Sequence, residues 1–265
     1  MDIFNNNEQN SNQGYNPSFG PTIKDTFYEP QDESPFVGAI PATDENTLLS
    51  RVFRWMALGL GISALSAFAG MYGIMYLVYT GRESLISPLT IGLAIVELIL
   101  VIVFSIRLPK MNATTARICF LVYALINGVT LSSILLMYTA SSVFSTFIAA
   151  GAMFGAAALY GKITKKSLAN WGTYLFMGLF GLIVASIINI FLGNSLMTMI
   201  ISVIGIVIFV GLTAYDVNRI RDFARSEGLS DTNNVKKVVI WGALQLYLDF
   251  INLFLKLLRL LGRRK

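Results

Sequence analysis

The chain has 265 residues, of which 55% are hydrophobic and only 13% are charged, whereas a soluble domain carries roughly 25% charged residues. It contains one cysteine and no histidine, which excludes an intrachain disulfide, a Cys/His zinc site and histidine-based catalysis. This composition argues against a soluble enzyme.

The N-terminal segment is polar and acidic. Its first 50 residues hold eight of the 15 acidic residues and one base, so the rest of the chain is strongly basic. We expect residues 1–46 to form a disordered tail before a membrane domain over residues 47–265. The bases of that domain lie between apolar runs and not in one polar, aromatic-rich patch, so nucleic acid is not indicated as a partner.

Seven long apolar stretches follow the tail. A bilayer core of about 30 Å requires roughly 20 apolar residues in a helix, and lipid offers no partner for free backbone groups. The sequence therefore predicts an all-α membrane protein with seven transmembrane helices embedded in a lipid bilayer. The predicted spans are approximately residues 55–79, 88–106, 118–138, 143–160, 173–192, 197–216 and 238–261.

The basic residues indicate how these spans are oriented. With the N-terminus inside, 14 of the 20 bases lie on the inner side, and the outer loops contain only Arg82. This distribution predicts a multi-pass protein with a cytoplasmic N-terminus. The cluster Arg263 to Lys265 conflicts with it if the last helix crosses fully. A re-entrant last segment is the alternative, but no proline interrupts that segment, so a full crossing is favoured.

Small residues spaced along the helices predict close helix packing. Gly151 and Gly155 are four residues apart in the fourth span, and Gly178 and Gly181 lie in the fifth. Such spacing permits backbones to approach one another. We interpret these glycines as packing residues without a functional role.

Three acidic residues lie within the spans: Glu97, Asp216 and Asp249. A charge in hydrocarbon is costly, so these residues are the first candidates for function. Two carboxylates that approach each other would share a proton, and together, when deprotonated, they offer the oxygen ligands that calcium prefers. Arg107 or Arg259 could hold one carboxylate ionised. Pairing of the aspartates requires a tilted last helix or one that starts later, near residue 241.

The last span carries a polar stripe. At 100° per residue, four side chains fall with Asp249 within one arc of about 80°, and Tyr247 falls outside it. The four are Gln245, Asn252, Lys256 and Arg259. Such a face is expected to look into the bundle or onto a hydrated path; a buried seam that only joins helices is the alternative.

Two sequence blocks carry a family resemblance. They are GLTAYDVNRI at residues 211–220 and ALQLYLDFINLFLKLLRLLG at residues 243–262, together with Asn127 and Gly128. Over residues 48–262 the chain resembles the bacterial branch of the Bax inhibitor-1 family, and the acidic tail is unmatched. The resemblance implies six helices arranged around a central C-terminal helix in an inner (plasma) membrane.

The same resemblance implies a pH-sensitive calcium-leak channel whose aspartate pair, Asp216 and Asp249, is the pH sensor and cation site. Calcium would be the transported ion, protons would control it, and neither a cofactor nor a catalytic residue is expected. Glu97, Arg107 and Arg259 match family positions for gating or charge compensation, although Arg107 is displaced by one residue relative to Glu97 and is followed by LPK instead of an all-basic run.

Other functions compete with the channel. An intramembrane aspartyl protease would need a glycine-x-glycine-aspartate motif, and Leu246, Tyr247 and Leu248 precede Asp249 here. A retinal protein would need a lysine deep in the last helix, and Lys256 lies near its end. A non-channel regulator that binds a membrane quality-control protease, or another membrane partner, stays open as an alternative.

Overall fold

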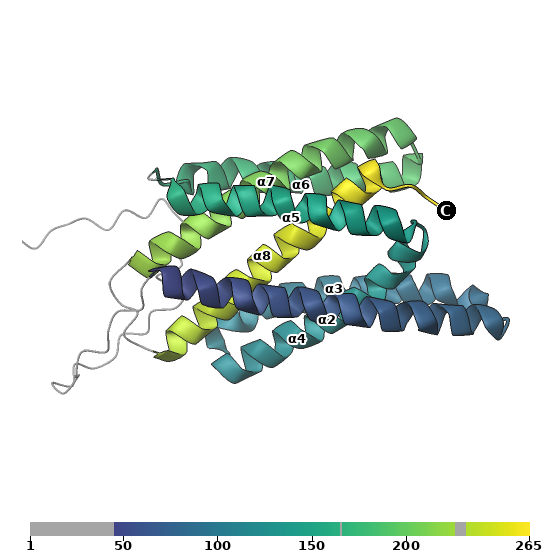
Figure 1. Ribbon diagram of the computed structural model, residues 1–265, viewed down its shortest axis with the longest axis horizontal. Coiled ribbons are helices and arrows are strands. Elements are labelled where there is room, and N and C mark those ends of the chain that lie inside the picture. Colours follow the sequence, from purple (N-terminus) through teal and green to yellow (C-terminus); the bar gives the residue numbers. More distant parts are fainter. Residues whose placement is uncertain (1–44, 165, 226–231) are drawn as a thin grey trace, which may run out of the picture. The chain divides into compact units, whose positions relative to one another are not determined.

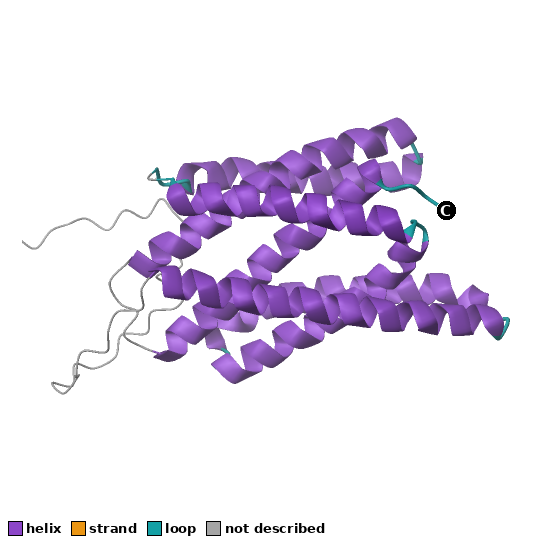
Figure 2. Cartoon of the chain, viewed as in Figure 1, coloured by secondary structure: helices purple, strands orange, loops and turns teal. Residues whose placement is uncertain are grey.

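The computed structural model describes residues 45–164, 166–225 and 232–265, and within them the chain forms seven long helices with no strand beyond one isolated bridge (Figures 1 and 2). All seven are long and apolar enough to cross a membrane, as predicted. The predicted tail lies outside the described residues, except its last two, which begin the first helix. The helices are α2 (Glu45–Tyr79), α3 (Ile86–Arg107), α4 (Ala113–Leu136), α5 (Ala140–Ile163), α6 (Ala169–Leu192), α7 (Ser195–Arg225) and α8 (Thr232–Leu261), with short 3-10 turns at Glu83–Leu85 and Leu108–Lys110.

The helices are longer than the predicted spans, mainly at one end of the bundle. α2 begins at Glu45 and not near residue 55, α7 continues to Arg225, and α8 begins at Thr232 and not near residue 238. Apolar length predicts only the part of a helix that crosses hydrocarbon. The additional turns carry polar and basic residues, which are stable as helix outside the lipid.

The helix α8 runs between two groups of three. In the first group α2 and α3 pack against α4. In the second group α5 and α6 pack against α7. α8 crosses obliquely between the two groups and contacts α2, α4, α5 and α7 (Figure 1). α8 is also the most buried of the seven. α3 and α6 lie mainly against α4 and α7, so a ring of six helices around α8 stays a prediction.

The outer helices α3 and α6 present apolar side chains outward. Leu98 and Ile102 of α3 and Phe180 and Ile190 of α6 are all about half exposed or more. An apolar surface of this kind is not stable in water, and it matches a hydrocarbon environment. The helices therefore contact the lipid bilayer, as a membrane-embedded protein requires.

The C-terminal residues are fastened to the turn between α4 and α5. Thr139 N–H donates to the carbonyl oxygen of Arg263, and Lys265 N–H donates to that of Met137, both at 3.0 Å. Arg263 N–H donates to Oγ of Ser142 at 3.0 Å. We call residues 137–142 and 263–265 the C-terminal clasp. α8 is one uninterrupted helix that ends at this clasp, so no break in it supports the re-entrant alternative, and the full crossing stays a prediction.

Most of the glycines that were predicted from their spacing to mediate helix packing do not do so. A Cβ atom added at Gly151, Gly155 or Gly181 would meet no atom within 4 Å, and one at Gly178 would lie 3.3 Å from a side-chain methyl of Ile208. Glycine spacing does not reveal which face of a helix meets a neighbour. The first three of these glycines therefore do not hold helices together.

Close backbone approach occurs instead at Gly128 of α4 and Gly161 of α5. A Cβ at Gly128 would overlap the carbonyl oxygen of Ser63 and Oγ of Ser66 on α2, and one at Gly161 would overlap the carbonyl oxygen of Ala214 on α7. Gly128 belongs to one of the motifs that carry the family resemblance. These two contacts fix the separation of helices within each group.

Candidate functional site

The structure brings Asp216 of α7 and Asp249 of α8 together in the interior. Their side chains are 4% and 5% exposed, and the two carboxyl groups interact electrostatically with each other. An ionised carboxylate is only an acceptor, so a hydrogen bond between the two groups would require a proton on one of them. Oδ2 of Asp249 is buried and has no hydrogen-bond partner among the described residues. The site is therefore a buried pair of interacting carboxyl groups, one oxygen of which accepts no hydrogen bond from the described residues.

The oblique course of α8 makes this contact possible. Asp216 lies in the second half of α7, whereas Asp249 lies near the middle of α8. The alternative of a later helix start is wrong, because α8 begins well before Trp241. α8 is inclined between the helix groups (Figure 1) and packs against α7, so the middle of α8 can meet a residue near the end of α7.

The guanidinium group that interacts with the aspartate pair was not predicted from the sequence. Arg219, three residues after Asp216 on α7, interacts electrostatically with it, and its Cζ lies 4.9 Å from the ring centroid of Trp241. Stacking on an indole restrains a guanidinium. Arg107 and Arg259 are exposed and make no hydrogen bond or ion pair found in the described part of the chain. The three-residue spacing between Asp216 and Arg219 in the motif YDVNR could have revealed this interaction from the sequence.

The polar stripe of α8 becomes more exposed toward the C-terminus. Gln245, Asn252 and Lys256 are half-buried, and Arg259 is exposed. Nδ2 of Asn252 donates to the Leu248 carbonyl of its own helix at 2.8 Å. The methylenes of Lys256 pack on α7, about 3.0 Å from where a Cβ of Gly205 would lie. Within the described residues, Asp249 is the member of this stripe that interacts with an acidic side chain of another helix.

A second polar group joins four helices on another side of α8. Nδ2 of Asn127 on α4 donates to Oε2 of Glu97 on α3 at 3.2 Å. The hydroxyl of Tyr247 on α8 donates to Oδ1 of Asn127 at 2.9 Å and lies 2.7 Å from Oγ of Ser63 on α2. We call Ser63, Glu97, Asn127 and Tyr247 the tyrosine network. Through this network Glu97 is linked to α8 two residues before Asp249. Oε1 of Glu97 is buried and has no hydrogen-bond partner among the residues that the structure describes.

Replacing Tyr247 with phenylalanine is expected to lower the free energy of unfolding by roughly 1–3 kcal/mol, because buried Oδ1 of Asn127 loses its donor. The midpoint of thermal unfolding of the purified protein in detergent measures this change. Tyr174→Phe is the matched control, since that side chain on α6 is 71% exposed. Equal midpoints for Tyr247→Phe and the unmodified protein would show that the tyrosine network contributes no stability.

Comparison with known proteins places the whole helical region in one sequence group. The sequence model of a family described as inhibitor of apoptosis-promoting Bax1 matches residues 45–265. The chain is 42% identical over 227 residues to the inner membrane protein YbhL of Escherichia coli strain K12, covering 85% of this chain and 95% of that protein. It is 41% identical over 225 residues to an uncharacterized protein of Borreliella burgdorferi, covering 83% and 94%. All seven helices lie within the region that the family model matches.

Proposed function

Because the chain belongs to the Bax inhibitor-1 family, we propose that it is a pH-sensitive calcium-leak channel in which Asp216 and Asp249 form the proton-coupled cation site. The buried, interacting carboxyl pair between α7 and α8 carries this proposal. The lipid-facing helices and the inner-membrane relative support a place in an inner (plasma) membrane. The distribution of bases supports a cytoplasmic N-terminus.

Protons and calcium compete for the same oxygens in this proposal. With one shared proton the pair carries a single negative charge and its hydrogen bond joins α7 to α8. Loss of that proton leaves two carboxylates that repel each other and frees their oxygens, including Oδ2 of Asp249, for a cation. The affinity of the pair for calcium therefore rises with pH.

Calcium is cargo here and not a resident ion. Among the described residues no group of three or more acidic, histidine or cysteine side chains is placed to hold a metal. A calcium ion takes six to eight oxygen ligands, so two carboxylates leave most of its shell to water and backbone carbonyls. Weak coordination of this kind suits passage, because an ion must also leave the site.

Arg219 and the tyrosine network both influence the carboxyl pair. Arg219 compensates its charge from within α7, in the role that the sequence resemblance gave to Arg107 or Arg259. The tyrosine network ties Glu97 to α8, so displacement of α8 disturbs the hydrogen bonds of a helix that does not touch the pair. We assign Glu97 to gating on this basis.

Calcium uptake into liposomes that contain the purified protein tests the proposal, over about pH 6 to 8, where a shared proton would titrate. We expect uptake above that of protein-free liposomes, with a rate that differs between the two ends of this range. Uptake equal to that of protein-free liposomes at every pH would overturn the channel and leave the non-channel regulator, for which binding of a membrane protease or another membrane protein is then the activity to measure.

A further inference from the structure

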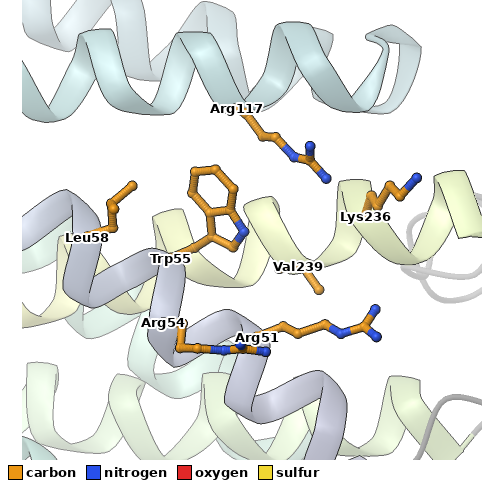
Figure 3. A pocket seen from close by; sticks show the side chains of 7 residues that line it. All are labelled: Arg51, Arg54, Trp55, Leu58, Arg117, Lys236 and Val239. Atoms are coloured by element: carbon orange, nitrogen blue, oxygen red, sulfur yellow. The ribbon is translucent and has the colours of Figure 1, made fainter.

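A basic pocket lies at the end of the bundle where α2, α4 and α8 begin (Figure 3). Its volume of about 410 Å³ is in the range of small-molecule sites. Four cationic side chains line it: Arg51, Arg54, Arg117 and Lys236. The apolar part of the lining consists of Trp55, Leu58 and Val239.

The cations of the basic pocket have no counter-charge among the described residues. No described acidic side chain lines it, and the ion pair found in the described part of the chain, Arg221 with Asp222, involves none of its residues. Nε of Arg117 is buried and finds no hydrogen-bond partner in the described part of the chain, and Cζ of Arg117 lies 5.6 Å from the ring centroid of Trp55. A buried donor without an acceptor is costly. The pocket is therefore incomplete without an anion that accepts hydrogen bonds.

The position of the basic pocket adds to this charge. Arg117 and Lys236 are the fifth residues of α4 and α8, so the pocket lies near the N-terminal ends of two helices, whose dipoles favour an anion. Trp55 lies close to the start of a membrane span, the level at which tryptophan meets lipid headgroups. Leu58 is 48% exposed, so the apolar side of the pocket continues toward the hydrocarbon region.

We propose that the basic pocket binds the phosphate group of an anionic phospholipid. Basic pockets between transmembrane helices are suited to phosphorylated headgroups. The guanidinium groups and the ammonium group supply charge and donors for the phosphate oxygens, while Trp55 and Leu58 contact the first methylenes of the acyl chains. A free phosphate ion would leave this apolar side without a contact. The proposal does not depend on the function of Asp216 and Asp249.

Native mass spectrometry of the delipidated full chain tests this site, with phosphatidylglycerol and phosphatidylcholine titrated separately. We expect preferential binding of phosphatidylglycerol. Replacing two pocket cations, Arg51→Gln with Lys236→Gln, should weaken that binding at least about tenfold, since each cation near the membrane contributes about 1 kcal/mol. The matched control is Lys110→Gln with Lys162→Gln, which removes two exposed cations at the same end of the bundle outside the pocket.

Three results would overturn the proposal. The first is a lack of specificity, which means either equal binding of the two lipids or an equal loss of phosphatidylglycerol binding in the pocket variant and in its control. The second is displacement of phosphatidylglycerol by inorganic phosphate at a comparable concentration, which would make the site one for a free anion. The third is displacement by an added peptide of residues 1–44 at lower concentrations than the lipid itself requires, which would assign the pocket to the acidic N-terminal segment. Unchanged thermal unfolding of the pocket variant would show that lost binding is not lost folding.

Discussion

Asp249→Asn is expected to remove the pH dependence of calcium uptake while leaving the bundle folded. Asparagine has nearly the same shape as aspartate, and its amide donates to Asp216 at every pH, so the hydrogen bond between α7 and α8 no longer depends on a shared proton. The variant also loses one of the two carboxylates available to the cation. Uptake into liposomes should then differ by less than about a factor of two across the range in which the unmodified pair titrates.

Substitutions at two other aspartates, Asp216 and Asp222, make this test specific. Asp216→Asn removes the other member of the pair and should have the same effect. Asp222→Asn makes the same chemical change on α7, at a side chain that is 42% exposed and pairs with Arg221, and should retain the full pH dependence. A pH dependence that survives in both pair variants would show that another group senses the proton.

Gly128→Ala is expected to destabilise the protein, whereas an alanine at Gly151 should not. The new Cβ would overlap a backbone oxygen, that of Ser63, as well as Oγ of Ser66. A side chain could rotate away, but a backbone carbonyl cannot, so α2 and α4 must separate. Overpacking of this kind costs typically about 1–3 kcal/mol, and displacement of Ser63 would also disturb the tyrosine network.

Gly151→Ala is the control for this prediction. That position is also inside a helix, and an added Cβ would meet no atom within 4 Å. Alanine favours a helix over glycine by roughly 0.5–1 kcal/mol, so the midpoint of thermal unfolding should rise slightly or stay unchanged, whereas that of Gly128→Ala should fall. Parallel shifts in the two variants would mean that close packing of α2 on α4 is not what Gly128 provides.

The number and order of the helices could be predicted because apolar length reports directly on the crossing of hydrocarbon. Their ends could not, since α7 continues for several polar turns beyond Asp216 and α8 begins at Thr232. The contacts between helices could not be predicted from the sequence either. Gly151 and Gly128 lie in equally apolar helices, and only the placement of α2 distinguishes the glycine that packs from the one that does not.

The aspartate pair could be anticipated because an acid within an apolar run has few other roles. Its surroundings could not, since they depend on which helix faces meet. Arg219 was overlooked because it lies in a basic segment at the end of a predicted span, where a base is expected to indicate only the orientation of the helix. Tyr247 fell outside the polar stripe, yet α8 is enclosed on several sides, and a second face of the same helix also carries buried hydrogen bonds.

The C-terminal clasp gives α8 a fixed pivot. Its last residues are bonded to the turn between α4 and α5, so any tilt of α8 is a rotation about that end. Displacement then grows with distance along the helix axis: Asp249 lies about 18 Å from Leu261 at helical rise, and Thr232 about 43 Å. An angular change that separates the two carboxyl groups by 1 Å therefore displaces the start of α8 by more than about 2 Å, on the side where Lys236 enters the basic pocket.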